Sequence, residues 1–351
     1  MSAERSAGPL SLISSGRRVT DPTPLIDGDL SPLDRLAGRS VISVLDLGRE
    51  ELLGLFSAAA RLQSGVARPA APLAGKILLT AFFEPSTRTR LSFESAGHRL
   101  GAAVIGIPDA RSTGVHKGES LADTGVMLGT YADVVVLRHT QDSSVHEIRA
   151  AGMAAPLVNG GNGCGEHPTQ AFADWYALLK WRSELADAEP PADRRISLCL
   201  LGTPSRMRSM RSFLLAATTH FPRAVRDLMV VSDSPEPLDD ELVTALTKAG
   251  ISHRRATGPE VDLTSFDVIY QNSLTLVDQE YQVLDSKVRL DRDTPLRPDT
   301  VVMHPLARQD ELSTDLDGTP HNLYFDQAEG AVFIRQALLL ALTGKVACVR
   351  D

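Results

Sequence analysis

The sequence predicts an α/β fold of two doubly wound domains, each a mainly parallel sheet flanked by helices. Two observations lead to this prediction. The chain has 351 residues, more than one hydrophobic core usually organises, so two domains are expected. From about residue 38 onward, short runs rich in β-branched residues alternate with longer segments in which apolar residues recur at three- or four-residue spacing. This alternation is typical of parallel α/β units.

Strands are expected where apolar residues form short, nearly continuous runs, because a sheet covered on both faces buries every side chain. In chain order these runs are Lys76–Phe83, Ala103–Ile107, Asp133–Arg138, Pro156–Asn159, Ile196–Leu201, Leu228–Ser232, Asp267–Gln271 and Thr300–His304. Helices are expected between them, where the apolar spacing changes to three or four residues. They are Arg49–Gln63, Arg88–Leu100, Glu119–Tyr131, Pro168–Glu184, Arg208–Thr219, Glu241–Ala249 and Val332–Leu342.

Changes in composition suggest the domain limits. Residues 1–35 mix Ser, Gly, Arg, Pro and Asp without an apolar core segment, which predicts a flexible N-terminal arm and not a signal peptide. Pro190 and Pro191 lie in a charged stretch after a long helical pattern and mark a boundary. We therefore expect a first domain at 36–180, a second at 190–325, and a C-terminal helical segment at 331–351 that packs back on the first domain.

The composition excludes several classes of protein. Apolar residues make up 43% and charged residues 23%, which are ordinary values for a folded globular protein. The formal charge of −8 gives no overall attraction to nucleic acid or to an anionic membrane. The three cysteines are widely spaced and no apolar run reaches 18 residues. We expect a cytoplasmic protein with no nucleic-acid partner and no membrane span.

The richest polar segment follows the first expected strand. Residues 84–90 read Glu-Pro-Ser-Thr-Arg-Thr-Arg and open a helix, where unpaired backbone N–H groups and the helix dipole favour a bound anion. The hydroxyls of Ser86, Thr87 and Thr89 and the guanidinium of Arg88 suit a phosphate. The alternative is an ordinary capped helix with a solvated basic first turn.

Further polar residues follow other strands, at the sheet edge where ligands bind in open α/β folds. Arg138 ends one strand, and Pro168 suits the first turn of a later helix, which places His167 and Gln170 at its start. The glycine-rich residues 159–163 lack the spaced fingerprint of a dinucleotide site. No second Cys/His cluster completes a metal site around Cys164 and His167. We therefore expect no metal and no cofactor.

Taken together, these motifs resemble those of the aspartate/ornithine carbamoyltransferase family over about residues 35–345. The motifs are Phe83-Glu84-Pro85-Ser86-Thr87-Arg88-Thr89-Arg90, Lys117-Gly118-Glu119-Ser120, Arg138-His139, His167-Pro168-Thr169-Gln170 and His304-Pro305-Leu306. Thr169 and Leu306 point to the aspartate branch of the family. The resemblance implies the family's two-domain fold, with the first domain binding carbamoyl phosphate and the second an acceptor amino acid.

The resemblance also implies a role for each matching residue. Ser86, Thr87, Arg88 and Thr89 would hold the phosphate of carbamoyl phosphate. Thr89, Arg138 and His167 would bind its carbonyl oxygen, which makes these three and Arg88 the expected catalytic residues. Gln170 and the backbone carbonyl of Leu306 would accept from its NH2 group.

Two residues of the resemblance concern assembly. Thr113 and Lys117 match a loop that completes the active site of a neighbouring subunit in this family. The resemblance therefore implies a homotrimer with shared active sites.

The acceptor site departs from the family pattern. Arg208, Lys117, Ser273 and Thr275 match its acceptor-binding positions, but Ser273 stands where the family has a second carboxylate-binding arginine. A hydroxyl cannot replace a bidentate charged fork. Several cations are possible substitutes: Arg206, Arg211, Lys287 and Arg289. The acceptor is therefore aspartate, an aspartate-like amino acid or a diamino acid.

Two further expectations remain open. Ala307 replaces a proline that follows a cis bond in the family, so we expect either a cis Leu306–Ala307 bond or a rebuilt loop. Domain closure is expected to bring Glu84 toward Arg208. A non-catalytic relative acting as a scaffold or regulatory subunit is the alternative to an enzyme.

Overall fold

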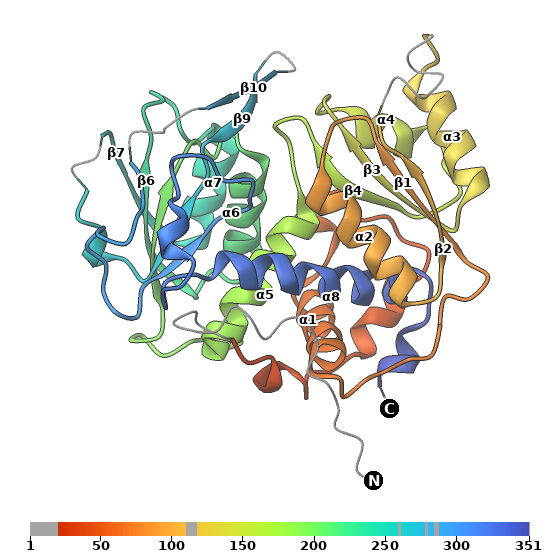
Figure 1. The fold of residues 1–351 in the computed structure, drawn as a ribbon, viewed down its shortest axis with the longest axis horizontal. Coiled ribbons are helices and arrows are strands. Elements are labelled where there is room, and N and C mark those ends of the chain that lie inside the picture. Colours follow the sequence, from red (N-terminus) through yellow and green to blue (C-terminus); the bar gives the residue numbers. More distant parts are fainter. Residues whose placement is uncertain (1–19, 110–117, 259–260, 278–279, 284–287, 351) are drawn as a thin grey trace.

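The computed structural model describes residues 20–109, 118–258, 261–277, 280–283 and 288–350. It contains two parallel sheets with helices between and around them (Figure 1). Of the expected N-terminal arm, residues 1–19 lie outside the described residues, as do Thr113, Lys117 and Lys287. The expectation of a flexible arm is wrong for residues 20–35, because Leu25, Leu30 and Leu33 are buried in the apolar core.

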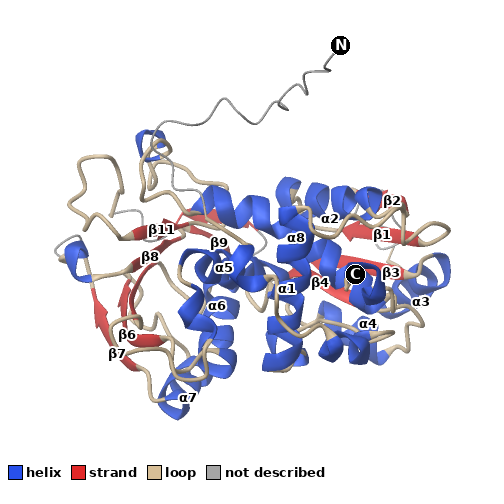
Figure 2. Cartoon of the chain, turned by 90° about the horizontal axis from the view of Figure 1, so that it is seen from below, coloured by secondary structure: helices blue, strands red, loops and turns tan. Residues whose placement is uncertain are grey.

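The first sheet is formed by β1 (Ile77–Phe82), β2 (Ala103–Ile107), β3 (Val134–His139) and β4 (Leu157–Asn162). Its order is β2-β1-β3-β4 and all pairs are parallel. Alternate side chains of β1 and β3 enter two separate cores, as the two-residue period of a strand requires. One face is covered by α3 (Leu121–Tyr131) and α4 (Ser144–Ala150) and the other by α1 (Arg49–Ser64) and α2 (Thr87–Arg99) (Figure 2).

The second sheet is formed by β5 (Ile196–Leu201), β6 (Val225–Val231), β7 (Ser252–Ala256), β8 (Val268–Gln271) and β11 (Val301–Met303). Its order is β11-β8-β5-β6-β7, again all parallel. Its helices include α6 (Arg208–His220) and α7 (Asp240–Ala249), and an antiparallel hairpin, β9 (Leu274–Val277) and β10 (Glu280–Val283), follows β8.

Two helices join the sheets. α5 (Pro168–Trp181) follows the first sheet and packs against α6 of the second, while α8 (Tyr324–Leu342) returns to contact α1, α2 and α5 (Figures 1 and 2). Side chains from both sheets and from these helices form one continuous apolar cluster. The carboxyl ends of the strands of the two sheets are thereby held around a shared opening.

Every strand and helix expected from the sequence is present, with small shifts at the ends. The ends of β4 and α5 and the start of β6 lie three residues from the expected positions. α8 begins at Tyr324, well before the expected Val332. α4, β7 and the β9–β10 hairpin are additional elements. Among the described residues, no helix has both the length and the apolar character needed to cross a membrane.

Candidate active site

A cavity of about 690 Å³ opens between the two sheets. Its lining comes from the first turns of α2, α5 and α6, from the loop after β11 and from α8. This is the position at which open parallel sheets bind ligands. The lining includes five arginines and no Asp or Glu of the described residues; the arginines are Arg88, Arg138, Arg206, Arg208 and Arg335. The cavity therefore favours anionic ligands.

The first turn of α2 lies at one wall of this cavity. Ser86 occupies the N-cap with extended backbone angles, φ −159° and ψ 104°, and its side chain makes no capping hydrogen bond. The hydroxyl of Ser86 is therefore not used to cap the helix. Thr87 and Arg88 are exposed and line the cavity, whereas Thr89 is buried. Backbone N–H groups, hydroxyls and a guanidinium meet here, which is the donor set that a phosphate requires.

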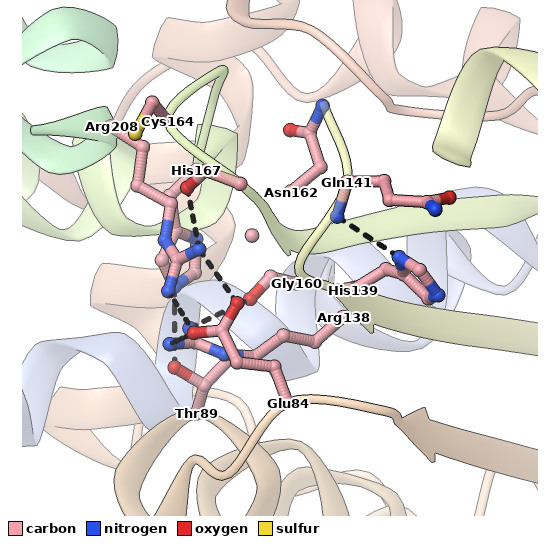
Figure 3. A network of polar contacts seen from close by, with 12 residues as sticks. Glu84, Thr89, Arg138, His139, Gln141, Gly160, Asn162, Cys164, His167 and Arg208 are labelled. Atoms are coloured by element: carbon pink, nitrogen blue, oxygen red, sulfur yellow. Dashed lines mark hydrogen bonds and ion pairs between the residues drawn. The ribbon is translucent and has the colours of Figure 1, made fainter. Parts of the chain in front are cut away.

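Glu84 lies between two guanidinium groups (Figure 3). Arg138 Nη2 donates to Glu84 Oε1 at 2.6 Å, and Arg208 Nη1 donates to Glu84 Oε2 at 2.9 Å. Arg138 also donates to the carbonyl of Gly160, and Arg208 donates to that of Gly163. The expected pairing of Glu84 with Arg208 is confirmed, and Arg138 shares the same carboxylate. The buried Arg138 and the partly buried Arg208 thus face one anion and leave net positive charge at the cavity.

His167 contacts the first turn of α2 through Thr89 and lies close to Arg138 and Arg208. Its Nε2 lies 3.2 Å from the hydroxyl of Thr89, and its Nδ1 is buried without a hydrogen-bond partner among the described residues. Burial and the positive charges of Arg138 and Arg208 hold the pKa of His167 well below its usual value. The imidazole is therefore neutral near neutral pH and can donate one hydrogen bond to a ligand oxygen.

Gln170 and Leu306 line the same cavity. Gln170 donates from Nε2 to Asp174 Oδ1 at 2.7 Å. The bond between Leu306 and Ala307 is cis, which is one of the two outcomes expected from the sequence. The N–H of Leu306 donates to His304 Nδ1 at 2.9 Å.

The expected acceptor residues are only partly brought together. Arg206 and Arg208 line the cavity, but Arg211 pairs with Asp239 and Glu241, and Arg289 is exposed outside the lining. Ser273 is buried with an unpartnered hydroxyl, and its neighbours Asn272 and Leu274 line the cavity in its place. Thr275 lies on β9 opposite Gln282.

Two residues of the site were missed by the sequence analysis. Arg335 of α8 lines the cavity, although its side chain is buried and stacks 4.8 Å from the centre of the Phe93 ring. Burial lowers the pKa of its guanidinium to about 9. Asp174 is fully buried behind Gln170. Arg335 could have been found in the sequence, because it is a lone arginine in the apolar stretch of the last helix. Asp174 has no comparable signal in the sequence.

Comparison with known proteins decides the family. Residues 39–180 match the family described as aspartate/ornithine carbamoyltransferase, carbamoyl-P binding domain. Residues 199–342 match its companion, the Asp/Orn binding domain. The chain belongs to the aspartate/ornithine carbamoyltransferase family. This confirms the fold class and the enzyme class predicted from the sequence, and it does not support a non-catalytic scaffold.

Individual relatives agree with this family assignment. The aspartate carbamoyltransferase catalytic subunit of Hyperthermus butylicus is 36% identical over 318 residues, covering 88% of this chain and 97% of that one. The Chromobacterium violaceum catalytic subunit is 33% identical, covering 86% and 96%. The Trypanosoma cruzi aspartate transcarbamoylase, solved with carbamoyl phosphate and aspartate, has a TM-score of 0.74 and 30% identity, covering 90% and 99%.

Proposed function

We propose that this carbamoyltransferase moves the carbamoyl group of carbamoyl phosphate to the amino group of an anionic amino acid, with aspartate as the first candidate. The observation that carries the proposal is one cavity in which the α2 N-terminus, Arg138 and His167 converge. Residues 36–180 would bind carbamoyl phosphate and residues 190–325 the acceptor, with 331–351 returning to the first domain.

The proposed chemistry is attack of an uncharged amine on the carbonyl carbon. A C–N bond forms, the C–O bond to phosphate breaks, and phosphate leaves. Thr89, Arg138 and His167 would donate to the carbonyl oxygen as it gains negative charge, and a single such donor is worth roughly 10²–10³ in rate. Because His167 is neutral and serves as a donor, the departing phosphate dianion is the group proposed to accept the amine proton.

The acceptor follows from the charge of the cavity. A diamino acid would bring a second ammonium group into a lining that offers five arginines and no described carboxylate. A dicarboxylate instead complements Arg208 and Arg206, and among the described candidates Arg206, Arg211 and Arg289 the cavity is lined by Arg206. Arg206 is therefore proposed to take the role that Ser273 cannot fill.

The assembly is proposed to be a homotrimer in the cytoplasm. Thr113 and Lys117 would complete a neighbour's site, and they precede α3 in the sequence. α3 lies at the outer edge of the molecule and exposes apolar side chains at Val126, Met127 and Tyr131 (Figure 1). Exposed apolar side chains of this kind are typical of a surface that meets another subunit. No nucleic acid or membrane enters this proposal.

Steady-state release of phosphate from carbamoyl phosphate tests the function. We expect turnover with aspartate and little with ornithine or shorter diamino acids. Arg206→Ala should raise the KM for aspartate by about 10- to 100-fold, the loss of one charge-assisted hydrogen bond. Arg289→Ala, an exposed arginine outside the cavity, is the matched control and should leave KM unchanged. Efficient use of a diamino acid, or an equal effect of both variants, would contradict the acceptor assignment.

A further inference from the structure

Asp174 of α5 is a buried carboxylate that holds three hydrogen-bond donors. Gln170 Nε2 and Gln327 Nε2 donate to Oδ1 at 2.7 and 2.8 Å, and the hydroxyl of Tyr270 donates to Oδ2 at 2.7 Å. The donors come from α5, α8 and β8, so the two helices that join the sheets meet the second sheet at this group. Burying a carboxylate is unfavourable unless it is well paired. Packing alone therefore gives no reason for a carboxylate at position 174.

The first arm of this network fixes the side-chain amide of Gln170. A carboxylate only accepts hydrogen bonds, so it selects the amide orientation whose NH2 group faces Asp174. The amide oxygen of Gln170 is then the atom left for a ligand in the cavity that this residue lines. Without Asp174 the two amide orientations would be similar in energy, and one of them would present a donor to the cavity.

The second arm runs through Gln327 to the loop after β11. Gln327 Nε2 donates to Asp174, and its Oε1 accepts from the backbone N–H of His304 at 3.0 Å. His304 Nε2 lies 3.0 Å from Glu311 Oε1, which places the ring proton on Nε2 and leaves Nδ1 to accept from the N–H of Leu306. The backbone of Leu306 is therefore anchored through His304 and Gln327 to Asp174.

We propose that Asp174 is a positioning residue that orients both acceptors for a carbamoyl NH2 group, Gln170 Oε1 and the Leu306 carbonyl. It thereby sets the preference for carbamoyl phosphate over acyl phosphates that lack N–H groups, such as acetyl phosphate. This inference rests on the proposed function. A site built to bond an N–H group rejects an analogue without one because its own buried acceptors are left unpaired.

Calorimetric binding of carbamoyl phosphate, acetyl phosphate and inorganic phosphate tests the proposal. Asp174→Leu has a similar branched shape but leaves no acceptor for Gln170 or Gln327, so both arms are broken. We expect the Kd of carbamoyl phosphate to rise about 10- to 100-fold. The Kd values of acetyl phosphate and inorganic phosphate should change by less than about threefold, because the phosphate-binding residues proposed in the first turn of α2 are unchanged.

Two further variants separate positioning from general damage. Gln327→Met breaks only the second arm. It should lower the ratio of carbamoyl to acetyl phosphate affinity, but by a smaller factor than the Asp174 variant does. Tyr270→Phe removes the third donor of Asp174, which lies on neither arm, and should leave the ratio unchanged. Thermal melts establish that each variant is folded, and the ratio from Gln327→Met decides if Asp174→Leu does not fold.

The outcomes distinguish the two proposals. If the wild-type protein does not bind carbamoyl phosphate, the proposed function fails. If it does bind, but the ratio is unchanged in the folded variants of Asp174 or Gln327, the positioning role alone is overturned. An equal fall of the affinity ratio in Tyr270→Phe would also overturn the positioning role. It would show that any disturbance near Asp174 lowers the ratio, even one outside the two arms.

Discussion

At the scale of single residues, the site depends on side chains whose charge state is set by burial. His167 is 5% exposed and lies among arginines. A protonated imidazole would place a further positive charge in that group, so the folded protein holds this ring neutral. A ring held neutral can serve as the proposed donor to a carbonyl oxygen, and its lowered pKa makes it a weak base toward the acceptor amine.

His167 gives a prediction about pH. The unfolded imidazole takes up a proton near pH 6.5, whereas the folded one does so only at lower pH, because burial and then Arg138 lower its pKa. Below pH 6.5 the unfolded state therefore binds more protons at this residue, and its contribution to the free energy of unfolding falls as the pH decreases. Carbon NMR of the ring, assigned by comparison with His167→Gln, should show a titration midpoint well below 6.5. A midpoint at or above 6.5 would contradict the donor role.

At the scale of elements, the site requires close approach of backbone to side chain. β4 contains Gly161 with φ +113°, a conformation that L side chains rarely adopt. A Cβ atom at this position would lie 3.0 Å from Arg138 Nη1 and 3.1 Å from Arg208 Nε. The guanidiniums of Arg138 and Arg208 can approach the end of β4 this closely because residue 161 has no side chain.

Gly161→Ala should therefore displace both arginines. We expect kcat/KM to fall by about 10- to 100-fold, since small misplacements at a reacting centre have effects of that size. Gly250→Ala is the matched control, because Gly250 also has a positive φ, +69°, but a Cβ atom there would meet nothing within 4 Å. It should lower stability without lowering kcat/KM. Equal activity in the two variants would show that Gly161 does not shape the site.

The elements that the sequence predicted are those with a strong apolar pattern. β2 and β5 have the expected bounds because their apolar runs end abruptly. β7 reads Ser-His-Arg-Arg-Ala and pairs only at the sheet edge, so its pattern is not that of a buried strand. The residues that approach one another across the fold, such as Glu84 with both Arg138 and Arg208, are partly predictable from motifs. Asp174 is not, because a single Asp in a helix carries no spacing signal.

At the scale of the whole molecule, one carboxylate ties the two sheets together at the cavity. Glu84 follows β1 of the first sheet, and Arg208 begins α6 of the second. α5 and α8 hold the same two halves together through a shared apolar core. The first turn of α2, Arg138 with His167, and Arg206 with Arg208 therefore come from different parts of the chain but line one cavity.

We propose above that the first turn of α2, Arg138 and His167 bind one molecule of carbamoyl phosphate. A crystal structure of this protein with that ligand shows directly if they do. The phosphate is expected at the first turn of α2 against Ser86, Thr87 and Arg88, with the carbonyl oxygen within hydrogen-bonding distance of Thr89, Arg138 and His167. A ligand bound elsewhere, or one whose carbonyl oxygen contacts neither Arg138 nor His167, would contradict the account.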